Sequence, residues 1–233
     1  MTTQSVSAAF QTSQGEALTF VNHAVTDGTE TELTSGGFNV ISGQSAGTYG
    51  KDFTITHGLV SAGDNIVYAY LANQDGSINL VLPVARNSAT IAGMVQLCRP
   101  VKLIPGMTLR VLTQTTGSTA VGMSVFCSSG VSHIFTGTAG SAGSVSNLTS
   151  IKTGTDVGDV LTSQTIAKAW ISSTADWDAA EAAGFPFVAL ISGNGRSKAM
   201  WVQQMPVYNQ PMPQMYPAKV ELNDTLQIDT DTS

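Results

Sequence analysis

The sequence has little charge. Asp, Glu, Lys and Arg together make up only 11% of its 233 residues, whereas ordinary soluble domains carry about a quarter. Solubility must come instead from Ser, Thr, Asn, Gln and Gly. Such a surface can pack against copies of itself or against a partner without a large desolvation cost. We therefore expect a protein that forms oligomers.

Clusters of basic residues and long apolar runs are also missing. The ten Lys and Arg residues are scattered, the formal net charge is −6, and no apolar run approaches the length that spans a bilayer. Binding to nucleic acid needs clustered Lys and Arg, so we expect neither a nucleic acid nor a membrane as a partner. The N-terminal residues lack the basic and apolar regions of a signal peptide, and we expect synthesis in the cytoplasm.

Cysteine is scarce. Cys98 and Cys127 are the only two in the chain, and no spacing typical of a metal site is present. Isolated cysteines of this kind usually serve as small buried apolar side chains. Because both lie on strands that we expect to be neighbours, a disulfide between them remains an alternative.

Alternation of apolar and polar residues, with Gly, Pro, Ser and Thr at the ends of each run, predicts strands throughout the chain. We expect a central hairpin in residues 91–135, with strands at 107–113 and 120–127. Two further hairpins are expected, at 65–84 around Asp75 and Gly76, and at 185–204 around Gly195. Further strands are expected at 17–21, 38–41, 53–59, 160–162 and 220–228. A short helix is expected at 172–184, with Asp residues in its first turn and Gly184 at its end.

These elements predict an all-β fold, a β-sandwich or jelly-roll-like domain with one short helix and extended terminal arms. Residues 1–16, rich in Ser, Thr and Gln, are expected to be an N-terminal arm, and residues 17–204 the sandwich domain. Residues 205–233 are expected to be a Pro- and Met-rich C-terminal arm with a final strand. Prolines force extended geometry, and the apolar side chains between them need a surface to cover, so we expect this arm to cross a neighbouring subunit. The expected partner-binding residues are Met205, Pro206, Tyr208, Pro211, Met212, Pro213, Met215 and Tyr216.

No motif predicts catalysis, a cofactor site or a metal site. Ser124 lies in a sequence that lacks the second glycine of a nucleophile elbow, so we interpret it as a strand residue. His133 follows Ser128 and Ser129 closely, but a catalytic triad is defined by geometry that sequence does not supply. Asp156 and Asp159 precede an expected strand and are interpreted as surface residues, although acid–base work or cation binding is an alternative. The acidic turn at 27–32 does not match a Ca²⁺ loop and is interpreted as a solvated turn.

Aromatic residues make up only 7% of the chain, so most of them are needed for the core. Alternation would bury Tyr68 and Tyr70 on one face of a strand. A sugar-stacking platform of Tyr68, Tyr70, Trp170, Trp177 and Trp201 is the alternative.

Residues 101–126 look like a jelly-roll strand pair, and residues 205–217 form the Pro-rich arm. With the low charge and the abundance of Ser, Thr, Gly and Ala, they make the chain resemble the capsid decoration (cement) proteins and minor structural proteins of tailed bacteriophages. The resemblance implies a non-enzymatic virion protein, made in the host cytoplasm, that clamps neighbouring capsomers as a homotrimer. Its partners would be copies of itself and the major capsid protein or another virion protein. A receptor- or glycan-binding head domain of a phage fibre and, less favoured, a hydrolase using His133 or an Asp remain alternatives.

Overall fold

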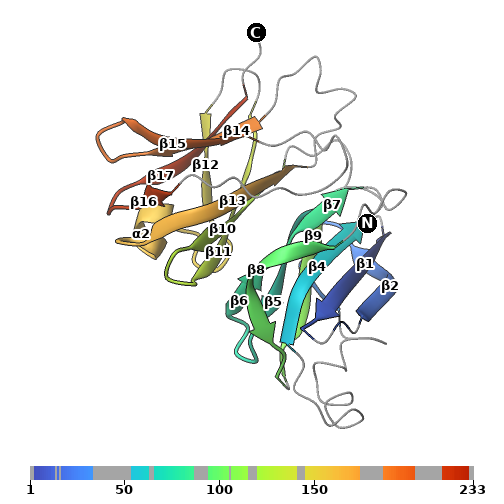
Figure 1. Ribbon diagram of the computed structural model, residues 1–233. Helices are drawn as coiled ribbons and strands as arrows, with labels where there is room; N and C mark the ends of the chain where they lie inside the picture. The colour runs from blue at the N-terminus through green and yellow to red at the C-terminus, as the bar shows by residue number, and fades with distance from the viewer. Residues whose placement is uncertain are drawn as a thin grey trace. The chain divides into compact units, whose positions relative to one another are not determined.

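The computed structural model describes residues 3–13, 15, 17–33, 54–62, 66–86, 94–104, 106–114, 120–140, 145–173, 186–202 and 217–230. They form two compact all-β units, one from the described residues up to 114 and the other from those after 119 (Figure 1). Nearly all strand pairs are antiparallel, which confirms the all-β, sandwich-like fold class. The chain divides into these two units near residue 115, however, whereas the sequence predicted one sandwich domain over 17–204.

The first unit contains two sheets. The five-stranded sheet has the order β2-β1-β4-β7, with β8 also pairing with β4. Its strands are β1 (Thr3–Thr12), β2 (Ala17–Thr26), β4 (Thr54–Ala62), β7 (Val84–Arg86) and β8 (Val95–Lys102). The four-stranded sheet has the order β3-β9-β5-β6. Its strands are β3 (Thr31–Leu33), β5 (Ile66–Ala72), β6 (Ile78–Val81) and β9 (Thr108–Thr113).

Strand β1 replaces most of the predicted N-terminal arm. It lies between β2 and β4 and pairs with both. Val6, Ala8 and Phe10 alternate along it and are buried, which is the period of a strand with one face in a core. Ser7 and Ala9 occupy the positions between them, and the many Ser, Thr and Gln residues of the segment hid this alternation from the sequence prediction.

Strand β5 is buried along its whole length, so both of its faces are covered. It pairs with β6 through a turn in which Gly76 has a φ of +79°, which confirms the first predicted hairpin. Strand β9 alternates between buried and half-buried residues and lies between β3 and β5.

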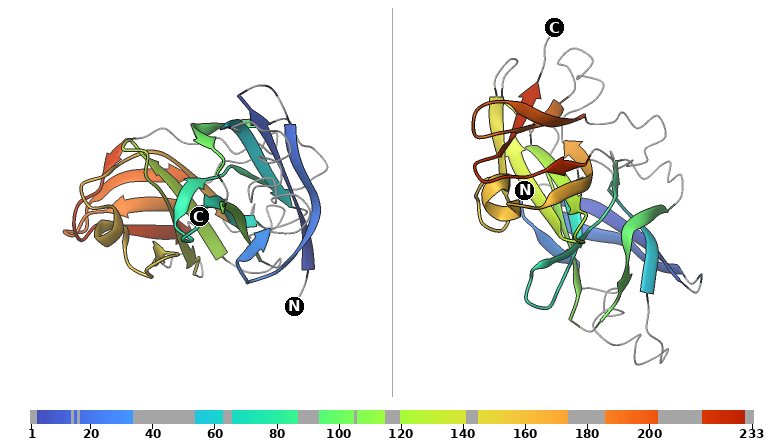
Figure 2. Two further views of the ribbon diagram at one scale, coloured as in Figure 1. Left: turned by 90° about the horizontal axis from the view of Figure 1, so that it is seen from below. Right: turned by 60° about the vertical axis from the view of Figure 1, so that its left-hand side comes forward.

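The second unit contains one eight-stranded sheet of order β15-β14-β17-β12-β11-β10-β13-β16. Its strands are β10 (Ala120–Cys127), β11 (Ser132–Thr138), β12 (Val145–Ser150), β13 (Thr165–Ser173), β14 (Pro186–Ile191), β15 (Ser197–Val202), β16 (Ala218–Lys219) and β17 (Thr225–Thr230). Strand β13 also contacts β14 and β15, which are not its neighbours in the sheet. The sheet therefore folds over on itself, and its strands can be followed from yellow-green to red in Figure 2.

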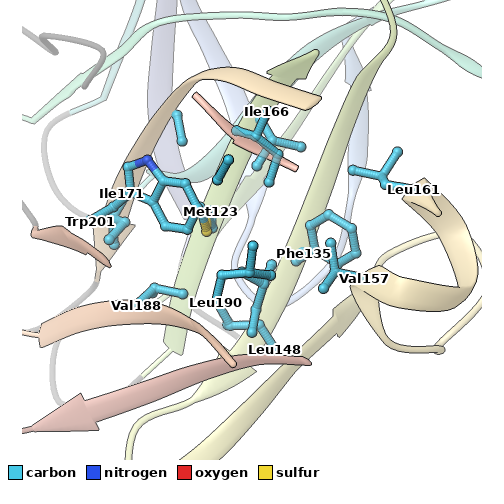
Figure 3. Packing of buried hydrophobic residues seen from close by; sticks show 14 of the residues in the cluster. Met123, Phe135, Leu148, Val157, Leu161, Ile166, Ile171, Val188, Leu190 and Trp201 are labelled. Carbon is cyan, nitrogen blue, oxygen red and sulfur yellow. The ribbon is translucent and has the colours of Figure 1, made fainter. Parts of the chain in front are cut away.

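The folded sheet encloses an apolar cluster. Met123, Phe135, Leu190 and Trp201 are each fully buried in it, and they come from four different strands (Figure 3). The helix α2 (Val157–Leu161) adds Val157 and Leu161 to the same cluster. Burial of large side chains from most strands of the sheet stabilises the unit by the hydrophobic effect.

The predicted central hairpin is wrong. Strand β9 pairs with β3 and β5 in the first unit, whereas β10 pairs with β11 and β13 in the second. Alternation identifies a strand but not its partner, and here two strands that follow each other in sequence belong to different units. Cys98 on β8 and Cys127 on β10 are likewise in different units, and no disulfide joins them. Burial raises the pKa of Cys127 to about 11, so this thiol stays protonated.

The predicted helix at 172–184 is wrong at its start, because β13 extends to Ser173. The rest of this helix, residues 174–184, lies outside the described residues. The predicted strand at 38–41 lies outside them as well. The helix α2 instead occupies the place of the predicted strand at 160–162. Asp156 is its N-cap residue and Asp159 lies in its first turn, where the helix dipole favours negative charge. The third predicted hairpin is confirmed by β14 and β15, with Gly195 at a φ of +81° in the turn.

The last predicted strand is present as β17, but it is not part of an arm. Strand β17 lies between β14 and β12 and pairs with both. Its residues Leu226 and Ile228 are fully buried in the core of the second unit. Among the described residues, no helix is long and apolar enough to cross a membrane.

Candidate functional site

Three polar clusters gather the titratable side chains that could carry chemistry. The first, the tyrosine–glutamate cluster, lies on the four-stranded sheet of the first unit. The second is the pair of His133 and Ser150, and the third, the lysine–carboxylate cluster, is Lys198 with Glu221 and Asp224; both belong to the second unit. The residues of the tyrosine–glutamate cluster are Glu30, Glu32, Tyr68, Tyr70 and Arg110.

Strand register brings the tyrosine–glutamate cluster together. Tyr68 and Tyr70 are two residues apart on β5, so both side chains lie on the same face of the sheet. Arg110 on β9 is paired with Tyr70 on one side and with Glu32 of β3 on the other. Glu30 precedes β3, and its carboxylate reaches the same face.

The Glu30 carboxylate is the centre of this cluster. The Tyr68 hydroxyl donates to its Oε2 at 2.9 Å, and the Tyr70 hydroxyl lies 2.9 Å from both of its oxygens. Arg110 donates to Glu30 at 3.2 Å and to Glu32 at 3.1 Å. The charged side chains are between 26% and 35% exposed, whereas both tyrosines are buried. One carboxylate therefore satisfies two buried phenol hydroxyls.

Burial raises the pKa of Tyr68 far above its ordinary value, and the charge of Glu30 and the hydrogen bond to it raise this pKa further. Burial and the hydrogen bond to Glu30 likewise raise the pKa of Tyr70. Burial alone would lower the pKa of Arg110, but the hydrogen bond to Glu30 and the surrounding negative charge raise it overall. Both phenols are thus held protonated as donors, and the guanidinium is held as a cation. A tyrosine that acts as a general base or a nucleophile needs a lowered pKa, so the cluster is suited to joining strands.

The acidic turn at 27–32 divides its carboxylates between different partners. Asp27 accepts a hydrogen bond from Thr113 at 2.9 Å, whereas Glu30 and Glu32 are both engaged by Arg110. In the part of the chain that the structure describes, no group of three His, Cys, Asp or Glu residues could hold a metal ion.

His133 pairs with Ser150, a serine that sequence proximity did not suggest. The Nε2 of His133 lies 2.8 Å from the Ser150 hydroxyl oxygen, and β11 and β12 bring the two side chains together. The same hydroxyl oxygen accepts hydrogen bonds from the backbone N–H groups of Lys152 and Thr153, and Ser150 is only 3% exposed. A buried oxygen with these contacts is placed to hold a turn, not to attack a substrate.

Burial, with a smaller contribution from the charge of Lys152, lowers the pKa of His133 to about 4. The imidazole is therefore neutral at physiological pH, and it can hydrogen bond to Ser150 without a buried charge. Ser129, which the sequence placed near His133, instead donates to Gln164. Ser124 is buried within β10, as expected of a strand residue.

The lysine–carboxylate cluster joins β15 to the segment before β17. The Nζ of Lys198 lies 2.7 Å from Oδ2 of Asp224 and 3.1 Å from Oε2 of Glu221. The Asp224 side chain is 1% exposed, that of Lys198 is 23% exposed, and that of Glu221 is 60% exposed. Burial alone would lower the pKa of Lys198, but its hydrogen bonds to the two carboxylates raise it overall. The amine therefore rests as a cation between two acceptors.

The alternative of an aromatic sugar platform is wrong for four of its five residues. Tyr68, Tyr70, Trp170 and Trp201 are between 0% and 6% exposed, so their rings are not available to stack on a ligand. Trp177 lies outside the described residues.

The predicted partner-binding residues of the arm are not tested by the structure. All eight lie within 203–216, outside the described residues: Met205, Pro206, Tyr208, Pro211, Met212, Pro213, Met215 and Tyr216.

Sequence reasoning missed the polar clusters themselves. The two tyrosines were expected to share a buried face, and they do, but nothing in the sequence linked them to Glu30, some 40 positions away. The pairs of Lys198 with Asp224 and His133 with Ser150 are also distant in sequence. Spacing within one strand predicts a shared face, whereas contacts across strands depend on the order of strands in the sheet.

Comparisons with known proteins do not add a relative: no family model, no curated protein and no solved structure matches this chain.

Proposed function

We propose that this protein is a non-enzymatic structural protein of a virus particle, which decorates or cements a capsid through an oligomeric β-domain. Its partners would be further copies of itself, as a trimer, and the major capsid protein or another virion protein. The segment 205–216 would supply the contacts that reach a neighbouring subunit.

One observation carries the proposal: the chain has few charges, and several of them are engaged with one another inside two compact β units. Glu30 and Glu32 are bound to Arg110, and Glu221 and Asp224 are bound to Lys198. These six side chains are thus engaged in internal contacts. The surface that remains is mostly uncharged, which suits close packing against other proteins.

The oligomer is tested by light scattering after size exclusion. A molar mass near three chains of 24.2 kDa, unchanged between low and high salt, is expected because uncharged contacts are little affected by ionic screening. A monomer at all concentrations would refute the trimer, and a mass that falls with added salt would refute uncharged contacts as its cause.

The arm is tested by replacing residues 205–216 with a Gly/Ser segment of equal length. This replacement leaves β17 in place, which a deletion of 205–233 would not. Loss of binding to purified capsid particles, with an unchanged far-ultraviolet circular dichroism spectrum, is expected. Full binding by the replaced protein would remove the arm from the proposal, and loss of strand signal would show that the segment is needed for folding instead.

A further inference from the structure

The lysine–carboxylate cluster contains the groups that form an intramolecular amide. It has a primary amine, a buried carboxyl group at hydrogen-bonding distance, and a second carboxylate on the same amine. Lys198 and Asp224 are 26 positions apart in sequence. We propose that Lys198 and Asp224 become joined by an amide bond between Nζ and the Asp224 side-chain carbon, with Glu221 relaying a proton. This inference does not rest on the proposed function.

The structure holds the two reacting groups in place before any reaction. Asp224 is fixed by its backbone, because its N–H donates to the Glu221 carbonyl and its own carbonyl accepts from Gly158. Its side chain is fixed as well, since Oδ2 accepts from the Glu221 N–H at 2.8 Å and from Lys198 at 2.7 Å. Lys198 extends from β15, which pairs with β14 over most of its length. Reactants oriented in this way reach effective molarities of roughly 10⁵–10⁸ M, which favours condensation even in water.

The reaction balances without a cofactor. One proton of the Lys198 ammonium passes to Glu221, and the free amine then attacks the carboxyl carbon of Asp224. The C–O bond to one carboxyl oxygen breaks as the C–N bond forms. That oxygen leaves as water, with the proton that returns from Glu221 and a second proton from the nitrogen. Glu221 is regenerated, and its 60% exposed side chain gives the water a path to solvent.

The environment favours the product and sets the pace of the reaction. An amide removes a charge from Asp224, which is 1% exposed, and charges in such places carry a desolvation cost. Both carboxylates raise the pKa of Lys198, so the amine must lose a proton before it can attack. We therefore expect the bond to form slowly after folding. The amide would close the chain between β15, an edge strand of its sheet, and the segment that leads into β17.

Intact mass spectrometry of the purified full-length chain tests the proposal. The expected mass is lower than that of the sequence by one water molecule, and trypsin is expected to leave the bond after residue 198 uncut because the amide has no charge. The linked peptides that carry Lys198 and Asp224 should then be found by fragmentation. A mass equal to that of the sequence, both when fresh and after prolonged incubation, would overturn the proposal.

Two variants identify the atoms involved. Asp224→Asn presents the same carbon with an amide leaving group, so it is expected to lose one ammonia in place of one water. Lys198→Arg cannot form the bond and is expected to have its full sequence mass. Loss of water that persists in Lys198→Arg would show that it comes from a cyclic imide elsewhere and would overturn the proposal. Because the cross-linked peptide is sought in the unaltered chain as well, the result does not depend on either variant folding.

Discussion

Replacing Glu30 with alanine is expected to destabilise the first unit strongly. Its carboxylate accepts hydrogen bonds from Tyr68 and Tyr70, which are 5% and 0% exposed. Leaving a buried hydroxyl without its acceptor costs about 1–3 kcal/mol. The Tyr70 hydroxyl also has a hydrogen bond with Arg110, which remains in this variant. The lost ion pair between Glu30 and Arg110 is partly exposed and contributes little. We expect the free energy of unfolding to fall by about 2–4 kcal/mol.

Glu32→Ala is the matched control. Glu32 is bound to the same Arg110 at 3.1 Å, but no tyrosine hydroxyl donates to it among the described contacts. Its loss should cost only about 0–1 kcal/mol, as for other partly exposed ion pairs. Glu30→Gln should lie between the two, because the amide keeps one acceptor oxygen and turns the other position into a donor.

The assay is equilibrium denaturation in urea, followed by far-ultraviolet circular dichroism. All three tryptophans, at positions 170, 177 and 201, follow residue 115 in the sequence, so their fluorescence reports on the second unit and not on the altered site. Equal destabilisation by Glu30→Ala and Glu32→Ala would refute the reasoning, since it would mean that the phenol hydroxyls find other partners at no cost.

Three further changes test other parts of the structure. The pKa of His133 is lowered from 6.5 to about 4, so the unfolded chain binds a proton at a higher pH than the folded chain does. The free energy of unfolding is therefore expected to fall by up to about 3 kcal/mol as the pH drops from about 6.5 to 4. Urea titrations at several pH values should show a smaller dependence of this free energy on pH for His133→Gln. Gly158→Ala would place a methyl group 2.6 Å from a backbone nitrogen of the 221–224 turn and should cost more than about 2 kcal/mol, whereas Gly154→Ala, which meets no atom within 4 Å but has a φ of +70°, should cost about 1–2 kcal/mol. Leu190→Ala, in the core, should lower the free energy of unfolding by about 2–5 kcal/mol and lower the thermal midpoint with it. Leu222→Ala, at a side chain that is 64% exposed, should change the free energy of unfolding by less than about 0.5 kcal/mol.

Many strands could be predicted from the sequence, but β1, β12, β13 and most of the strand partners could not. Strand β9 shows perfect alternation, and the turns with Gly76 and Gly195 need a positive φ that glycine adopts without strain. Short turns of this kind fix the partner as well as the strand, so both hairpins were predicted correctly. Strands β9 and β10 also follow each other in sequence, but adjacency does not fix a partner, and each of them pairs with other strands.

The helix α2 was missed because it is only five residues long. A segment of this length holds barely more than one turn, which is too short for a helical period to appear. Its stability comes from Val157 and Leu161, which are buried in the core, and from the close approach of Gly158 to the turn before β17. These are contacts with distant parts of the chain, which local sequence does not reveal.

The position of β17 changes how the C-terminal part of the chain should be understood. The prolines between 205 and 217 suggested one continuous arm, because repeated Pro predicts extended geometry. Yet β17 lies in the middle of the eight-stranded sheet, with Leu226 and Ile228 in the core. The segment that we propose to reach another subunit therefore lies within 203–216, between β15 and β16, which both belong to the eight-stranded sheet. Because both flanking strands belong to that sheet, the Gly/Ser replacement changes the segment between them without releasing a terminus.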